Sequence, residues 1–185
     1  MPPRIQIRTR FFVAVEGESE RSFVAWLQRL SETNLRIHLD TFPLCGGSYK
    51  TMLKAAIREH ERRRGKSGAY KNCFLIVDSD RADRGDDDWP VEQLKREAAA
   101  AKFTVCLQRP NHEGLLLRMM PGMERENTDA ASAKTKLKKR WPAYEKPANA
   151  NALARQFSLD HLLRAASVDA DLRAFLEIIG LAGNR

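Results

Sequence analysis

Short apolar runs alternate with amphipathic segments over the first two thirds of the chain. Four of the runs are compact and rich in β-branched or aromatic residues, which is typical of buried strands. They occupy residues 11–15, 35–39, 73–77 and 103–107. Helical spacing or helix-forming composition marks residues 20–30, 49–64, 89–101 and 111–120. This alternation predicts an α/β domain over residues 1–122, with a mostly parallel four-stranded sheet covered by helices on both faces.

The composition changes after Gly122, and residues 123–185 predict a helical C-terminal extension. Polar residues come first, followed by a basic stretch over 134–140 and a linker-like segment over 147–151. Two amphipathic helices are then expected over residues 159–166 and 169–179. The pattern allows the extension either to pack on the sheet or to form a small lobe.

Composition narrows the class of protein. Of the 185 residues, 43% are hydrophobic and 30% charged, and no apolar run is long enough to cross a bilayer. Residues 1–10 are basic but lack the apolar region of a signal peptide. Cys45, Cys73 and Cys106 are odd in number and form no CxxC pair, which argues against a disulfide framework or a zinc site. We therefore expect a cytoplasmic protein with no membrane partner.

The charge is unevenly distributed. The formal net charge is +8, which favours a polyanionic partner. Six aspartates fall between Asp78 and Asp88, whereas residues 134–146 carry six basic side chains and one acid. An acidic focus within a basic chain suggests a metal site that faces a phosphate-bearing substrate.

Two of the predicted strands end in carboxylates. The first is followed by Glu16-Gly17-Glu18-Ser19-Glu20, and the third by Asp78-Ser79-Asp80. Ligands of open α/β sheets bind at the carboxyl ends of the strands, and Mg²⁺ prefers oxygen ligands. Either motif alone also fits a solvated turn. Together they predict a Mg²⁺ or Mn²⁺ site, beside which a glutamate of raised pKa can act as general acid or base.

Both acidic motifs resemble the signatures of a known domain. Residues 13–20 (VAVEGESE) and 74–80 (FLIVDSD) look like the two motifs of the Toprim domain, which topoisomerases, primases and OLD-family nucleases share. The small RloB-like Toprim proteins are more similar still, and residues 109–114 (RPNHEG) stand where that family has a late glutamate element. The resemblance covers about residues 11–120. Here His112, Gly114 and leucines replace the aromatic-rich sequence of the family.

The resemblance implies a Toprim-type sheet and a Mg²⁺-dependent nuclease that acts on DNA, tRNA or another RNA in bacterial or phage defence. Glu16 matches the acid/base glutamate, which also lies at the metal, and Glu20 matches an additional catalytic acid. Asp78 and Asp80 match the metal-binding pair, and Glu113 matches the late glutamate as a further metal ligand. A partner ATPase encoded nearby and a homo-oligomer are both compatible with a small effector of this kind.

Several basic residues are candidates for contact with nucleic acid. Phosphate contacts are expected from Lys50, Arg109, His112, Lys136, Lys138, Lys139 and Arg140. Basic runs are equally often solvated faces, and a histidine beside a site is often structural. Trp141 and Tyr144 could stack on bases, but we favour a role in pinning the extension to the domain.

Other functions fit the sequence less well. Residues 45–50 lack the spacing of a nucleotide P-loop. In haloacid-dehalogenase phosphatases the Asp-x-Asp motif ends the first strand and is followed two residues on by Thr or Val. Here it follows the third strand, and Ala82 holds that place. The chain has no room for the extra domains of topoisomerases or primases. A non-catalytic nucleic-acid-binding or sensor module with a structural ion stays open as the alternative to a nuclease.

Overall fold

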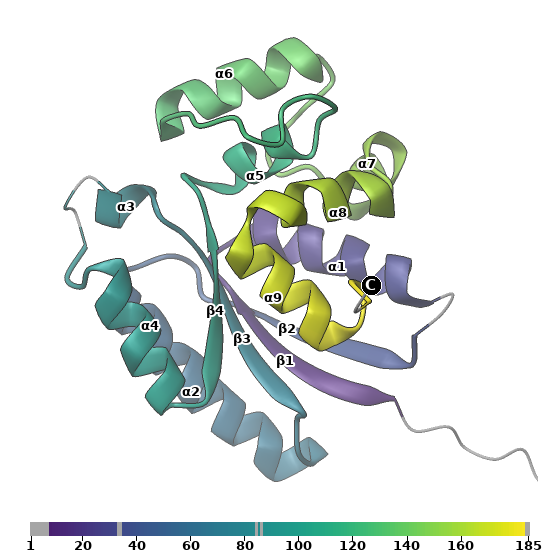
Figure 1. Cartoon of the computed structure of the whole chain (residues 1–185). Coiled ribbons are helices and arrows are strands. Elements are labelled where there is room, and N and C mark those ends of the chain that lie inside the picture. The colour runs from purple at the N-terminus through teal and green to yellow at the C-terminus, as the bar shows by residue number, and fades with distance from the viewer. Residues whose placement is uncertain (1–7, 33–34, 84, 86, 184–185) are drawn as a thin grey trace, which may run out of the picture.

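The computed structural model describes residues 8–32, 35–83, 85 and 87–183, so most of the basic N-terminal segment lies outside it. Its centre is a four-stranded sheet in the order β2-β1-β3-β4, with every pair parallel (Figure 1). The strands are β1 (Thr9–Val15), β2 (Ile37–Pro43), β3 (Asn72–Asp78) and β4 (Phe103–Gln108). The predicted parallel sheet is confirmed. Strand β2 begins and ends later than predicted because it pairs along the whole length of β1.

Helices cover both faces of this sheet (Figure 1). They are α1 (Glu18–Glu32), α2 (Tyr49–Ser67), α3 (Asp80–Asp83), α4 (Val91–Ala100), α5 (His112–Arg118), α6 (Ala130–Arg140), α7 (Ala150–Gln156), α8 (Leu159–Val168) and α9 (Ala170–Ile179). Helix α3 was not predicted. Helix α7 begins inside the expected linker, because the side chain of Asn149 caps it by accepting hydrogen bonds from two backbone amides. Within the described ranges, no helix is long and apolar enough to span a membrane.

The two-residue period of the strands divides the core into two layers. In β1, Phe11, Val13 and Val15 face the side of α1 and α9, whereas Phe12 and Ala14 face α2 and α4. All five are buried, which explains why the strand appears in the sequence as an uninterrupted apolar run. The sheet is thus fixed from both sides, and its carboxyl edge is a rigid platform.

The C-terminal extension packs on the sheet and shares its core. The ring of Phe175 in α9 lies 4.7 Å from that of Phe74 in β3, in an edge-to-face arrangement. Trp141 packs against Phe157 at 5.7 Å, and Tyr144 is 1% exposed. The Tyr144 hydroxyl donates a 3.2 Å hydrogen bond to Glu113, and Phe157 packs against Trp26 of α1 at 6.4 Å. The aromatic side chains after α6 therefore contact the domain, as we expected from the sequence.

Because Phe175 joins the extension to the sheet, Phe175→Ala should destabilise the whole fold. Loss of a buried phenylalanine costs about 3–5 kcal/mol, and urea unfolding should show one transition at a lower midpoint. Val168→Ala, on an exposed side chain of α8, should change the unfolding free energy by less than about 0.5 kcal/mol. If the sheet of Phe175→Ala unfolded at the wild-type urea midpoint, the extension would fold separately from it.

Candidate metal and catalytic site

Parallel pairing brings the acids after β1 and β3 to one edge of the sheet. Val15 lies opposite Ile76, and the Glu16 amide donates a hydrogen bond to the Ile76 carbonyl. The Oε2 of Glu16 accepts a 2.9 Å hydrogen bond from the backbone N–H of Asp78 across this edge. The predicted meeting of Glu16 with the Asp-x-Asp motif is present in the structure.

Glu20 closes the turn between β1 and α1. Its Oε2 accepts a 2.9 Å hydrogen bond from the Gly17 N–H, and the side chain is 4% exposed. Helix α1 begins at Glu18, two residues before the predicted start, and Ser19 is buried in its first turn. A carboxylate in this position is favoured by the partial positive charge of the helix N-terminus.

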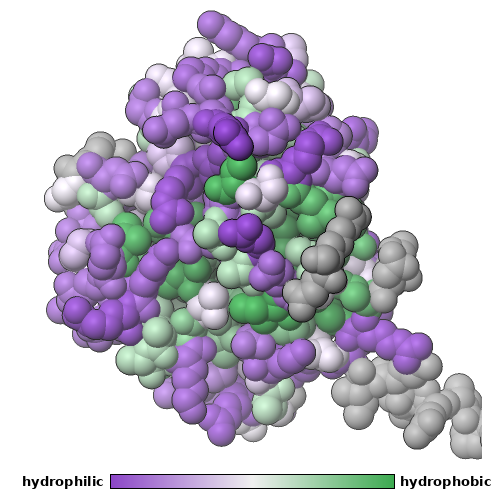
Figure 2. All heavy atoms as spheres, in the orientation of Figure 1, coloured by the Kyte–Doolittle hydropathy of each residue, from purple (hydrophilic) through white to green (hydrophobic). Residues whose placement is uncertain are grey.

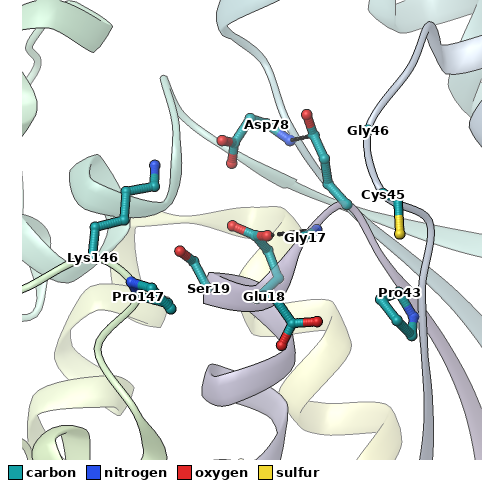
Figure 3. A pocket seen from close by; sticks show the side chains of 11 residues that line it. Gly17, Glu18, Ser19, Pro43, Cys45, Gly46, Asp78, Lys146 and Pro147 are labelled. Atoms are coloured by element: carbon teal, nitrogen blue, oxygen red, sulfur yellow. Dashed lines mark hydrogen bonds between the residues drawn. The ribbon is translucent and has the colours of Figure 1, made fainter.

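A cavity of about 430 Å³ opens at this edge, a volume common for ligand sites. Its lining comes from four separate segments of the chain. They are the acidic turn over residues 16–20, the loop with Pro43, Cys45 and Gly46, the end of β3 at Asp78, and Lys146 with Pro147 (Figure 3). Lys146 approaches from the C-terminal extension, on the side away from Cys45 (Figure 3).

Asp78 carries the strongest electrostatic signal of the site. Burial, reinforced by the carboxylates of Glu20, Glu16 and Asp80, raises the pKa of Asp78 to about 9. Its Oδ1 is buried and accepts no hydrogen bond from the described residues. A buried carboxylate oxygen without a partner is costly, so this atom is suited to a ligand that brings positive charge.

Glu16 and Glu20 share this environment. Burial raises the pKa of Glu16, an effect that the hydrogen bond from the Asp78 amide partly offsets. Burial also raises the pKa of Glu20. Both glutamates can therefore retain a proton at higher pH than an exposed glutamate, as general acid catalysis requires.

The donor chemistry fits a hard divalent cation, although the side chains are not yet arranged around one. Among the described residues, no group of three or more His, Cys, Asp or Glu side chains is placed to hold a metal ion. One oxygen of Glu16 is turned to the Asp78 amide, and Asp80 opens α3 with its N–H bonded to the Pro110 carbonyl. The unpartnered Oδ1 of Asp78 and the surrounding carboxylates are nevertheless the ligand type that Mg²⁺ and Mn²⁺ take. Asp86, from the same acidic stretch, lies outside the described residues.

The contacts of Glu113 do not match the metal-ligand role that the resemblance implies. Its carboxylate forms an ion pair with Lys146 at 3.0 Å and accepts a hydrogen bond from the Tyr144 hydroxyl at 3.2 Å. Burial acts to raise the pKa of Glu113, but Lys146 lowers it overall. The contacts therefore pair Glu113 with the cation of the cavity instead of adding it to the metal ligands.

His112 does not lie on a surface that nucleic acid can reach. The ring is 1% exposed, and its Nδ1 lies 3.1 Å from Oε1 of Gln108. Burial lowers the pKa of His112 to about 4, so the ring is neutral at pH 7. The prediction of a phosphate contact by protonated His112 is wrong for this structure, because the imidazole is both enclosed and uncharged.

The remaining cations divide into two groups. Lys136 pairs with Glu126 at 2.6 Å, and Arg109 pairs with Asp171 at 2.9 Å. The others are exposed and form no ion pair with a described residue: Lys50, Lys138, Lys139 and Arg140. The last three end α6, over which hydrophilic side chains gather in Figure 2.

Sequence reasoning missed two residues that complete the site. Lys146 lies within a basic segment and has no local motif, so only the packing of the extension shows that it lines the cavity. Tyr49, the first residue of α2, donates a 2.7 Å hydrogen bond to the Asp78 carbonyl. No sequence motif marks Tyr49, and the contact depends on how α2 packs beside β3.

Comparisons of the chain with protein-family models, curated proteins and solved structures give no match. The evidence for a function therefore lies in the residues around Asp78 and in their chemistry. The Toprim resemblance stays an expectation that rests on the two acidic motifs.

Asp78→Asn should stabilise the metal-free protein. Because the pKa of Asp78 rises from 3.8 to about 9 on folding, ionisation of this group favours the unfolded chain, increasingly so as pH rises through that interval. In EDTA, Asp78→Asn should melt above wild type at pH 8, and the difference should shrink at pH 5.

Mg²⁺ provides the second arm of this thermal unfolding experiment. The ion should raise the melting temperature of wild type and leave that of Asp78→Asn unchanged, since only wild type keeps the carboxylate. Glu177→Gln, on an exposed residue of α9, should respond to pH and Mg²⁺ as wild type does. An Asp78→Asn protein that melts below wild type at pH 8 would contradict the proposed cost of this buried carboxylate.

Proposed function

We propose that the protein is a Toprim-type, Mg²⁺-dependent nuclease that hydrolyses phosphodiester bonds in DNA or RNA as an effector of bacterial or phage defence. The observation that carries the proposal is the buried, unpartnered Oδ1 of Asp78 at the carboxyl edge of a parallel sheet. Burial of this oxygen without a hydrogen-bond donor costs free energy of folding, and a bound cation would offset that cost.

In this proposal Asp78 and Asp80 would hold Mg²⁺ or Mn²⁺, and Glu16 would lie beside the ion. The ion would supply neutralisation of the charge that develops on the phosphate. The protein's own groups perform the proton transfer. As water attacks the phosphorus and loses a proton to solvent, the P–O bond to the leaving oxygen breaks, and Glu16, whose pKa is raised by burial, can deliver its proton to that oxygen. Glu20 holds the Gly17 amide and thereby fixes the turn that presents Glu16.

Lys146 gives the cavity a positive side. Its ammonium pairs with Glu113, and its side chain is 47% exposed. The same charge acts to lower the pKa values of Asp78 and Glu20. A phosphate that enters the cavity therefore meets the acidic edge, suited to a cation, and a lysine that attracts the anion directly.

A polymeric substrate is favoured by the cations outside the cavity. Lys50 at the start of α2 and the exposed end of α6 provide positive charge on the surface, and the net charge of the chain is +8. Such surface charge is the usual means of holding a nucleic-acid backbone in a sequence-independent way.

The nuclease proposal predicts that Glu16→Gln and Asp78→Asn each lower the cleavage rate at least about 100-fold, since each removes a proton-transfer or ligand group. The measurement is cleavage of a panel of DNA and tRNA with Mg²⁺ or Mn²⁺, with and without the product of any adjacent ATPase gene. Glu177→Gln should cut at the wild-type rate.

Two outcomes would oppose this assignment. Cleavage at the wild-type rate by both variants would place the chemistry elsewhere. Binding without cleavage under every condition of the panel would favour the non-catalytic module.

The surface cations predict how binding depends on salt. In an Asp78→Asn background, which prevents cutting, alanine at Lys138, Lys139 and Arg140 together should weaken binding. The slope of log K against log [NaCl] should fall by about 2–3, or about 0.7–0.9 for each phosphate that the protein no longer neutralises. Fluorescence anisotropy of a labelled oligonucleotide measures this slope. Arg173→Ala, on an exposed part of α9, should leave it unchanged, and an unchanged slope in the triple variant would make α6 a solvated face only.

A further inference from the structure

A second cavity lies at the opposite edge of the sheet from Asp78. It has a volume of about 400 Å³, and its lining residues come from the end of α2 and the beginnings of β3 and β4. Seven residues of β3 separate the two edges, which at about 3.3 Å per residue is roughly 20 Å. The two cavities are therefore distinct sites.

This second cavity is lined by cations and by no acid. Arg64, Lys71 and Lys102 contribute to its wall, and no aspartate or glutamate of the described residues does. None of the three forms an ion pair with a described residue. Their charges therefore face the cavity without internal compensation.

The arginines near Arg64 do form ion pairs. Arg62 and Arg63 both pair with Glu59 at 2.6 Å, although they directly precede Arg64 in α2. Arg10, at the same end of the sheet, pairs with Asp40 at 3.0 Å. Compensation is thus available nearby, and the Arg10–Asp40 pair reaches the cavity wall only at the hydroxyl and ring of Tyr70. The carbonyl end of α2 adds only about half a negative charge, so three cations leave the cavity positive.

Lys102 occupies a backbone position that does not suit a lysine. It follows the last turn of α4 with a φ of +63°, in the left-handed region where glycine is the usual residue. A side chain there strains the backbone, and such strain often marks a functional position. Here the strained residue is one that adds a cation to the cavity.

Planar rings form another part of the wall. His60 and Tyr70 line the cavity with their ring centroids 5.7 Å apart, and Phe12 and Phe103 pack behind His60. Burial, together with the charge of Arg64, lowers the pKa of His60, so the ring is neutral at pH 7. Neutral rings of this kind can pack against a nucleobase.

We propose that this cavity binds a nucleotide, with the phosphates among Arg64, Lys71 and Lys102 and the base against His60 and Tyr70. The volume suits a small ligand. The proposal does not depend on the nuclease assignment, because it uses none of the residues around Asp78.

Calorimetric titration of the full chain in EDTA tests the proposal, since no cation can then link a nucleotide to the acidic edge. ADP, AMP, pyrophosphate and a short oligonucleotide are the probes. ADP should bind wild type, and Lys71→Ala or Lys102→Gly should each weaken binding about tenfold, as expected when a charged hydrogen bond is removed. Lys66→Ala removes an exposed charge from the same end of α2 outside the cavity and should bind ADP as wild type does.

Lys102→Gly also separates binding from folding. Glycine relieves the left-handed backbone, so this variant should melt at or above the wild-type temperature while it loses affinity. Asp78→Asn should bind ADP normally, so a failed nuclease assay leaves this result intact.

Three results would overturn the proposal. One is no binding of any nucleotide, and another is equal affinity in wild type and both cavity variants. The third is binding of oligonucleotides alone, which would assign the cations to nucleic acid. If pyrophosphate bound as tightly as ADP, the proposed contact of the base with His60 and Tyr70 would be wrong.

Discussion

The parallel pairing of β1 with β3 is the constraint on which the candidate site depends. It places Glu16, which follows β1, and Asp78, which ends β3, at the same edge, so that the Asp78 amide lies within hydrogen-bond distance of the Glu16 carboxylate. Both strands are buried on both faces, and neither can slip by one residue without turning its core side chains to the wrong layer. The apolar core therefore fixes the position of two acids that would repel each other in a free chain.

This placement concentrates negative charge that the sheet itself cannot balance. The Asp78 amide helps to stabilise Glu16, and the Gly17 amide helps to stabilise Glu20, but the Oδ1 of Asp78 has no such donor among the described residues. The C-terminal extension adds Lys146, whose ammonium is partly engaged by Glu113. The extension thus has an electrostatic role as well as a packing role, and the contacts of Phe175 with Phe74 and of Phe157 with Trp26 keep Lys146 at the cavity.

The sequence predicted the features that follow from local periodicity, and it missed those that follow from packing. Four apolar runs gave the strands, and the order of strand and helix implied parallel pairing, which brings Glu16 to Asp78. Lys146 and the burial of His112 were not predictable, because both depend on where segments distant in sequence come to rest. Helix α7 was missed for a different reason. A proline and two asparagines looked like a linker, although Asn149 is a helix cap.

Charge segregation between the two edges of the sheet has a common physical origin. After each parallel strand the following helix starts at the carboxyl edge and ends at the amino edge, so helix dipoles favour acids at the first edge and bases at the second. Glu18 and Glu20 in the first turn of α1, and Arg64 and Lys66 in the last turn of α2, follow this rule. The dipoles do not explain Asp78, because burial raises the pKa of this carboxyl despite any favourable helix dipole. They also do not explain Lys102, whose backbone is strained. Neither residue stabilises the fold in its observed position. Each lines a cavity in which a ligand of opposite charge would offset the cost.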